Sequence, residues 1–442
     1  MTAAPPPARR PRGGRAALAA ALLATSVAGG TLVASSGSGG SSALAAPAAS
    51  TSAPASSAPV VVTPEQRIAA LLPQRLAALH LGSRASVVVS DVDAGTDLVR
   101  VRATTPRLPA SLAKLATAVS AFASIGPDHR FTTTALVAPD GSLVLHGDGD
   151  PTLRSLDLRT LAAQVAPALG AHAGVRRTLV VDDSVYARPT LAPGWPRSYY
   201  LQEVSPVRGL TVDRTRSADT GLLAGRRFAS ALQALGVPVT AVVRRHTPAG
   251  SVQVGAVQGQ TLREVVAAML RVSDNDIAEQ LGRQVARAVG LPTTWRGAEQ
   301  ARALVLGRLG VPLAGVVLHD GSGLSRADRV PADTLAALLR LAADPAHPEL
   351  SSIAFGGSLP VAGVTGSLRP GRGRFETAPS KCAVGRLWAK TGLLRDVVGL
   401  AGYTRSTDGH LQAFVVLENG SRSTLALRRQ FDALGATVTG CW

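Results

Sequence analysis

The sequence predicts an α/β fold of the α+β type, in which a mainly antiparallel sheet is flanked by helices and a separate module is inserted into the chain. Two strands expected between residues 85 and 101 form a hairpin, and an apolar helix follows at once. Three strands expected between residues 386 and 417 precede a last helix. Residues 130–257 carry strands and helices of their own, which indicates the inserted module.

The N-terminal residues resemble a targeting segment. Four arginines precede an Ala/Leu-rich run over residues 16–34, and small residues lead up to Ala45, so residues 1–45 are expected to be a signal peptide cleaved after Ala45. An uncleaved anchor is the alternative. Residues 46–62 are rich in Pro, Ala and Ser and lack hydrophobic periodicity, which predicts a flexible tether. The sequence therefore predicts an exported protein of the cell wall or the outer face of the membrane.

The composition favours a globular body and argues against nucleic acid as a partner. The chain has 442 residues, 46% of them hydrophobic and 17% charged, which is enough for a sizeable core. Its net charge of +17 could indicate phosphate binding, but the arginines are scattered without interleaved aromatic residues. We expect no nucleic acid partner, whereas association with an anionic cell surface fits the same charge.

The elements are expected where hydrophobic periodicity and turn residues place them. Helices are expected at residues 64–80, from 111, at 153–174, 221–236, 261–270, 277–289 and 333–342, and from about 423. Strands are expected at residues 85–91, 98–101, 131–137, 143–145, 178–181, 237–244, 251–257, 386–389, 397–403 and 411–417. The catalytic domain is thus expected at 63–129 and 258–442, on either side of the inserted module.

Ser111 and Lys114 lie three residues apart where the second of these helices begins. Positions i and i+3 share one helix face, so the hydroxyl and the amine should be neighbours. A neutral lysine can activate a serine for attack on an acyl carbon. The alternative is a capping serine followed by a surface lysine. Only three of the 46 basic residues are Lys, and arginine cannot give up its proton, which favours a chemical role for Lys114.

Two further motifs follow in order along the chain. Ser273-Asp274-Asn275 occupies a turn between two expected helices, where its side chains can face a cleft. Lys390-Thr391-Gly392 follows directly on an expected strand. With Ser111-x-x-Lys114, these match the three signatures of the penicillin-recognising serine acyltransferases.

The wide gap between the first and second motifs narrows the resemblance. Three further segments, residues 149–153, 320–325 and 359–368, support the same resemblance. Residues 60–440 thus resemble the D-alanyl-D-alanine carboxypeptidase/endopeptidase family of low-molecular-mass class C penicillin-binding proteins, which is serine peptidase family S13. The resemblance implies a β-lactamase/transpeptidase-like fold. It also implies a serine carboxypeptidase that acts on peptidoglycan stem peptides ending in D-Ala-D-Ala and is inhibited by β-lactam antibiotics.

The resemblance also assigns roles to the motif residues. Ser111 would form the acyl-enzyme after Lys114 takes its proton, and Ser273 would relay a proton to the leaving amine. Asn275 would hold the substrate amide, and Lys390 with Thr391 would hold the terminal carboxylate, next to the Gly392 turn. The oxyanion would lie between the N–H groups of Ser111 and Leu393. A weakly active penicillin- or peptidoglycan-binding protein and a β-lactamase are the alternative functions.

Elementary electrostatics allows a neutral Lys114. Repulsion from Lys390 and partial desolvation would both lower the pKa of Lys114, and Asp274 would offset part of that change. The two lysines would then titrate as a coupled pair.

Leu393 departs from the family pattern, in which a hydroxyl residue usually follows Lys-Thr-Gly. The N–H of Leu393 can still serve the oxyanion hole, but a charged hydrogen bond to the substrate carboxylate, about 1.5–3 kcal/mol, would be missing. The sequence therefore predicts acylation by penicillin together with reduced carboxypeptidase turnover or an altered substrate.

Cysteine and histidine usage adds little further chemistry. Cys382 and Cys441 could form a disulfide in an exported protein, or remain two buried thiols. The eight histidines are isolated, so no metal and no cofactor is expected.

Overall fold

The structure is a computed structural model that describes residues 62–442. These residues belong to one compact unit, so the division into a catalytic domain and an inserted domain at residues 130–257 stays a prediction. The predicted signal peptide, residues 1–45, and all of the predicted tether except Val62 lie outside the described residues. Between residues 62 and 442, no helix is both long and apolar enough to cross a membrane.

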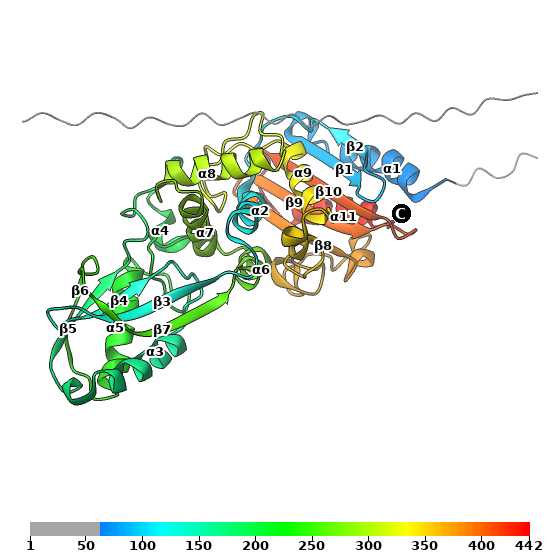
Figure 1. The fold of residues 1–442 in the computed structure, drawn as a ribbon. Coiled ribbons are helices and arrows are strands. Elements are labelled where there is room, and N and C mark those ends of the chain that lie inside the picture. Colours follow the sequence, from blue (N-terminus) through cyan, green and yellow to red (C-terminus); the bar gives the residue numbers. More distant parts are fainter. Residues whose placement is uncertain (1–61) are drawn as a thin grey trace, which may run out of the picture. The chain divides into compact units, whose positions relative to one another are not determined.

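The first sheet joins the two ends of the described chain and is antiparallel throughout (Figure 1). Its strands, in spatial order, are β2 (Thr96–Val101), β1 (Ala85–Asp91), β10 (Leu411–Asn419), β9 (Val397–Arg405) and β8 (Leu387–Leu394). The strands predicted at both ends of the sequence therefore form one sheet. The third motif lies on β8, which is the strand at its edge.

Helices cover both faces of this sheet because alternate residues of its central strands point to opposite sides. Val87 and Val89 of β1 pack into the core under α1 (Pro64–Ala78) and α11 (Leu425–Val438). Val88 packs into the core on the opposite face, where α2 (Ala113–Ile125) and α9 (Ala332–Ala343) lie. This two-sided burial explains why all seven residues of β1 are buried.

The second sheet is built from the middle of the chain and is mixed. Its strands, in spatial order, are β6 (Val239–Arg244), β5 (Arg177–Asp182), β4 (Leu143–Gly147), β3 (Arg130–Val137) and β7 (Val252–Thr261). The β3 and β4 strands pair antiparallel, whereas β5 runs parallel to β4 and β6 parallel to β5. α3 (Ser155–Ala168) and α5 (Thr220–Gln233) pack on this sheet over a separate core.

Helices α6 (Leu262–Val272), α7 (Asn275–Ala288) and α8 (Trp295–Arg308) pack with α2. No sequence pattern predicted an element at α8. Its inward face carries the buried Arg302, and its first turn contains Gly297, which approaches the Pro292 carbonyl so closely that a Cβ would lie 1.8 Å from that oxygen. A helix with these residues on its buried face shows no clear apolar periodicity.

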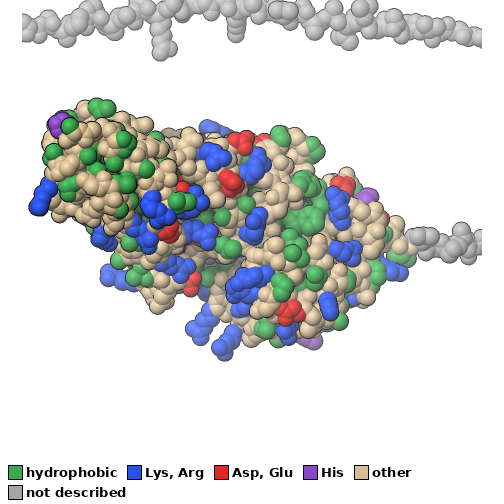
Figure 2. All heavy atoms as spheres, turned by 90° about the horizontal axis from the view of Figure 1, so that it is seen from below, with side chains coloured by type: hydrophobic (Ala, Val, Ile, Leu, Met, Phe, Trp, Pro, Cys, Tyr) green, Lys and Arg blue, Asp and Glu red, His purple; other side chains and the backbone are tan. Residues whose placement is uncertain are grey.

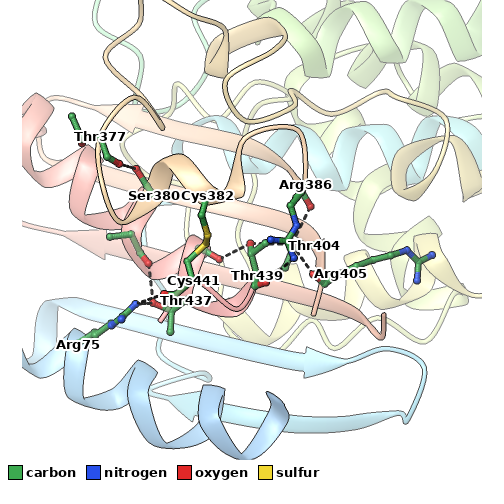
Figure 3. The surroundings of a disulfide bond; sticks show 12 residues. Arg75, Thr377, Ser380, Cys382, Arg386, Thr404, Arg405, Thr437, Thr439 and Cys441 are labelled. Atoms are coloured by element: carbon green, nitrogen blue, oxygen red, sulfur yellow. Dashed lines mark hydrogen bonds between the residues drawn. A yellow bond between two sulfur atoms is a disulfide. The ribbon is translucent and has the colours of Figure 1, made fainter. Parts of the chain in front are cut away.

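The two cysteines form a disulfide, Cys382–Cys441, whose Cα atoms lie 6.2 Å apart (Figure 3). The bond ties the segment before β8 to Cys441, three residues after the end of α11. The Arg75 guanidinium of α1 donates to Cys441 O at 3.0 Å and to Thr437 Oγ1 at 2.5 Å. Of the two possibilities that the sequence left open, the structure therefore has the disulfide, and it fixes the C-terminus against α1.

The face of the molecule shown in Figure 2 is basic without one dominant patch. Lys and Arg side chains are spread over the face shown in Figure 2, with fewer Asp and Glu among them. This distribution agrees with arginines that are scattered singly along the sequence.

Candidate active site

Ser111 lies in a tight turn at the start of α2. A 3-10 turn, Ala110–Leu112, leads directly into the helix, and Ala110 has a φ of 47°. Gly323 approaches this turn so closely that a Cβ there would lie 1.8 Å from the Ala110 carbonyl oxygen. The loop at residues 320–325 therefore packs against the turn that carries Ser111. Position 323 must be glycine, because no side chain fits there.

Lys114 is fully buried one turn after the serine. Its Nζ lies 3.1 Å from Ser111 Oγ, 2.7 Å from Asn275 Oδ1 and 2.9 Å from Ser322 O. Burial lowers the pKa of Lys114 to about 8, although nearby carboxylates, Glu279 first, act in the opposite direction. Ser111 and Lys114 are therefore neighbours, as predicted. Lys114 can lose its proton near neutral pH, as a general base must.

The second motif occupies the turn between α6 and α7, as the sequence predicted. Ser273 ends α6 in the left-handed conformation, with φ 62°, and Asp274 caps α7 by accepting a hydrogen bond from the Ile277 N–H at 3.0 Å. Asn275 is the first residue of α7 and lies between Lys114 and the Glu203 carbonyl, to which its Nδ2 donates at 3.0 Å. The turn thus directs Ser273 and Asn275 into the same cavity as Ser111.

The third motif brings the second lysine to the site. Lys390 is fully buried, and its Nζ donates to Ser273 Oγ at 2.9 Å and to Thr391 O at 2.8 Å. Burial lowers the pKa of Lys390 well below its usual range, and the charge of Lys114 lowers it further. The repulsion between the two lysines, which we expected to lower the pKa of Lys114, therefore lowers the pKa of Lys390. The pKa of Lys114 is lowered mainly by burial.

Gly392 and Leu393 line the approach to the serine from β8. A Cβ at Gly392 would lie 2.8 Å from the Pro109 carbonyl oxygen, so only glycine lets the strand pack against the Ser111 turn. The Ala389 N–H points away from β9 and donates to Pro360 O. With the two-residue period of a strand, the Leu393 N–H points to the same open edge, as the predicted oxyanion hole requires.

These side chains meet around one cavity of about 470 Å³. The cavity is lined by Ser111, Tyr199, Glu203, Ser273, Asn275, Leu324, Ser367, Thr391, Leu393, Leu394 and Arg395. Both lysines lie beneath it, buried and bonded to its serines. The structure therefore brings together site residues that the sequence predicted from three motifs far apart in the chain.

Sequence reasoning missed Ser367. This residue lies in a 3-10 turn, Gly366–Leu368, and its hydroxyl lies 2.9 Å from Thr391 Oγ1 at the wall of the cavity. The segment at residues 359–368 supported the family resemblance, but no local pattern shows that it lies against β8. A second hydroxyl thus stands beside Thr391, although Leu393 supplies none.

The middle of the chain also contributes to the cavity, through Tyr199 and Glu203 near the short helix α4 (Tyr199–Gln202). The nearby Trp195 Nε1 donates to Asp320 Oδ2 at 2.6 Å. Asp320 also accepts from the Gly323 and Ser325 N–H groups, so Trp195 is tied to the loop that packs against Ser111.

Two buried carboxylates organise the loop on which Lys114 depends. Glu279 accepts hydrogen bonds from the Gly321 and Ser322 N–H groups, both at 2.9 Å. Burial raises the pKa of Glu279 to about 7, and the charge of Asp320 acts in the same direction. No sequence pattern singled out Glu279, because it is one of several polar residues spread along α7.

Potential metal ligands gather away from this cavity. Within the described part of the chain, Glu65, Asp91 and His410 form one group of close potential ligands. His410 Nδ1 lies 2.8 Å from Asp91 Oδ2, which is the geometry of an ion pair. None of the three lines the cavity beside Ser111.

Comparison with known proteins places the chain in a family. The family model for the D-Ala-D-Ala carboxypeptidase 3 (S13) family matches residues 67–217 and 212–439. The chain is 33% identical over 403 residues to the carboxypeptidase DacB of Mycolicibacterium smegmatis, covering 86% of this chain and 85% of that protein. It is 30% identical over 450 residues to the D-alanyl-D-alanine carboxypeptidase of Actinomadura sp. (strain R39), covering 81% of each.

Solved structures agree on the fold. Penicillin-binding protein 4 (dacB) of Haemophilus influenzae matches with a TM-score of 0.70 at 23% identity, covering 83% of this chain and 97% of that one. A complex of the same protein with a novel β-lactam matches with a TM-score of 0.64 at 24% identity, over the same shares. These matches confirm the predicted fold, and the family model together with the relatives shows that the chain belongs to the D-Ala-D-Ala carboxypeptidase 3 (S13) family.

Proposed function

We propose that this chain is an exported serine D-alanyl-D-alanine carboxypeptidase and endopeptidase that cleaves peptidoglycan stem peptides through an acyl-enzyme on Ser111. The observation that carries the proposal is the pair of serine–lysine contacts in one cavity, Ser111 with Lys114 and Ser273 with Lys390. The name of the Actinomadura relative and the β-lactam bound to the Haemophilus protein support the substrate class and the acylation by penicillins.

In the acylation step, Ser111 Oγ attacks the carbonyl carbon between two D-alanines and its proton passes to Lys114 Nζ, 3.1 Å away. The developing oxyanion is held by the N–H groups of Ser111 and Leu393. The C–N bond then breaks as the leaving nitrogen takes the Ser273 proton, which Lys390 can replace across 2.9 Å. Lys114 releases the proton that it took from Ser111 to solvent, and solvent reprotonates Lys390. A water molecule then attacks the acyl-enzyme, its proton passes to Lys114, and Lys114 returns a proton to Ser111 Oγ as the ester bond breaks.

Substrate positioning falls to the polar groups around the serine. Asn275 is fixed by Lys114 on one side and the Glu203 carbonyl on the other, so its amide is oriented to hold the substrate amide. Thr391 lies on the far side of the cavity, next to Lys390 and Ser367. This group of a lysine and two hydroxyls supplies the donors that a terminal carboxylate requires.

The central test uses a fluorescent penicillin with the wild-type protein and the Ser111→Ala variant. We expect the wild type to be labelled covalently and the variant to remain unlabelled. Labelling that survives the substitution would show that Ser111 is not the nucleophile. A circular dichroism spectrum of the variant serves as the folding control.

A weakly active penicillin- or peptidoglycan-binding protein is the second candidate, and the observation that favours it is Leu393 at the wall of the cavity. Release of D-alanine from a pentapeptide separates the two functions, since a binding protein would be labelled and release almost none. Hydrolysis of the penicillin itself would instead identify a β-lactamase.

Export is part of the proposal because the substrate lies outside the cytoplasm. Its support is the sequence pattern of residues 1–45, with small residues before Ala45. The mass of the chain recovered from the cell envelope should correspond to a start at Ala46. A full-length mass in that fraction would instead favour an uncleaved anchor.

A further inference from the structure

A second cavity, of about 420 Å³, adjoins the cavity that contains Ser111. Ser367, Thr391 and Leu393 line both, so they form a shared wall. A part of the substrate that extends past the hydroxyl pair of Ser367 and Thr391 therefore enters the second cavity. We name it the arginine cavity, because four arginines line the rest of it.

The arginine cavity is lined by Arg369, Arg372, Arg374 and Arg428 and by no carboxylate. Arg374 is neutralised by a buried ion pair with Asp432, whose Oδ2 lies 2.8 Å from Arg374 Nε. The other three arginines form no ion pair with any residue between 62 and 442. Excess positive charge thus faces the space beyond Thr391.

Two of these three arginines are bonded to backbone carbonyls instead of carboxylates. Arg369 donates to Gly366 O at 3.1 Å, and Arg428 donates to Ser423 O at 2.8 Å. Glu376 lies in the same loop as Arg372 and Arg374, and it accepts hydrogen bonds from the N–H groups of Gly371 and Gly373. Guanidinium groups whose remaining N–H donors face a cavity suit a carboxylate.

The position of the cavity identifies which part of the substrate it would meet. In the proposed function, the acyl part is bound at Ser111 and the carboxylate of the leaving residue would lie at the hydroxyl pair of Thr391 and Ser367. What extends beyond that carboxylate belongs to the leaving group. A single D-alanine ends there, whereas the leaving strand of a crosslinked peptide continues and carries further carboxylates.

We propose that the arginine cavity, through Arg369, Arg372 and Arg428, binds a second carboxylate on the leaving group and so directs the enzyme towards acidic leaving groups, as in crosslinked stem peptides. This inference rests on the proposed acylation of Ser111. It assigns a substrate preference that the three catalytic motifs do not determine.

The experiment compares three synthetic peptides with the same acyl part and with D-alanine, D-glutamate or D-glutamine as the leaving residue. D-Glutamate and D-glutamine have nearly the same size and differ in charge, so their ratio isolates the effect of the second carboxylate. For the wild type we expect kcat/KM to be about tenfold higher for D-glutamate than for D-glutamine, the size of one charged hydrogen bond.

The variant is Arg369→Gln with Arg372→Gln, since both side chains are exposed and their loss should not disturb folding. We expect it to cleave the two peptides about equally while its activity on the D-alanine peptide is unchanged. The matched control is Arg176→Gln with Arg308→Gln, two exposed arginines outside the arginine cavity that remove the same charge. The control should keep the preference.

Equal rates for D-glutamate and D-glutamine in the wild type, or a preference that survives in the Arg369/Arg372 variant, would overturn the inference. Penicillin labelling of the same samples separates this result from failure of the proposed function. A labelled enzyme that cleaves the D-glutamine peptide leaves the function standing, whereas an unlabelled, inactive wild type would refute both.

Discussion

The two lysines of the cleft are both fully buried, but their surroundings differ. On the Lys114 side, the charges of Glu279, Asp320, Asp274 and Glu203 oppose the effect of burial and leave the pKa of Lys114 at about 8. On the Lys390 side, burial and the charge of Lys114 both lower the pKa of Lys390, and no carboxylate among residues 62–442 opposes them.

This difference gives the two lysines different roles: Lys114 exchanges a proton, whereas Lys390 binds an anion. Lys114 can hold or release its proton near neutral pH because its carboxylate neighbours are built into the protein. Lys390 lacks such a neighbour until a substrate carboxylate arrives, and an anion at Thr391 would then favour its protonated form. Substrate binding should therefore complete the charge balance of the Lys390 side.

Exchanging each lysine for arginine tests the comparison most severely. Arginine keeps the charge but cannot act as a base, so Lys114→Arg should slow acylation by a fluorescent penicillin by about 10³-fold. Lys390→Arg keeps a positive charge for the carboxylate and should slow acylation by only about tenfold.

Lys381→Arg is the matched control, because Lys381 is the third lysine of the chain and is exposed. Thermal unfolding of each variant checks that the larger side chain is accommodated. Losses of the same size at Lys114 and Lys390 would remove the distinction between their roles.

The pH dependence of acylation gives the next largest effect. Only neutral Lys114 accepts the Ser111 proton, so the rate should fall about tenfold per pH unit below about 8 and level off above it. Glu279→Gln removes a charge that favours protonated Lys114, so the midpoint should move to lower pH.

The measurement is the rate of penicillin labelling between pH 5 and pH 9, for the wild type and Glu279→Gln. Glu264→Gln is a suitable control, because Glu264 is exposed and caps α6 through Thr261. A midpoint that does not move in Glu279→Gln would contradict the electrostatic account of Lys114.

Two substitutions test how hydroxyl groups near Thr391 contribute to binding of the substrate carboxylate. Ser367→Ala removes the hydroxyl next to Thr391 and should lower D-alanine release about tenfold, whereas Leu393→Thr adds one and should raise it. Both effects should be small for a peptide whose terminal carboxylate is replaced by an amide.

D-Alanine release from the acid and amide forms of one peptide measures this pair of effects. Turnover that is unchanged in Leu393→Thr would show that the missing hydroxyl does not limit the enzyme. Equal losses of Ser367→Ala on both peptides would indicate a structural role for Ser367.

The smallest effect on activity is expected for the disulfide, which lies outside both halves of the cleft. The bond closes a segment of 59 residues, so Cys382→Ser with Cys441→Ser should lower the free energy of unfolding by about 2–4 kcal/mol. Urea unfolding measures the loss, and penicillin labelling below the transition should be little changed. A large loss of labelling would connect the C-terminus to the position of β8.

Local patterns predicted most of the elements and the three motifs. Ser111 and Lys114 are neighbours on a helix at any tertiary placement. The sequence predicted the next helix from residue 277, whereas α7 begins at Asn275 because Asp274 caps it. α8 was missed because its buried side includes an arginine and a glycine, so its helical period is hidden. Ser367 was missed because its partner, Thr391, is 24 residues away.

The sequence by itself determined the family, the nucleophile candidate and the order of the motifs, because those features depend on residue type and short spacing. Only the tertiary structure decided that burial, opposed by four carboxylates, sets the pKa of Lys114, and that Lys390 lacks such neighbours. It also placed the hydroxyl of Ser367 and the arginine cavity beside Thr391. Burial and charge proximity depend on distances between segments far apart in the chain, and no local pattern encodes those distances.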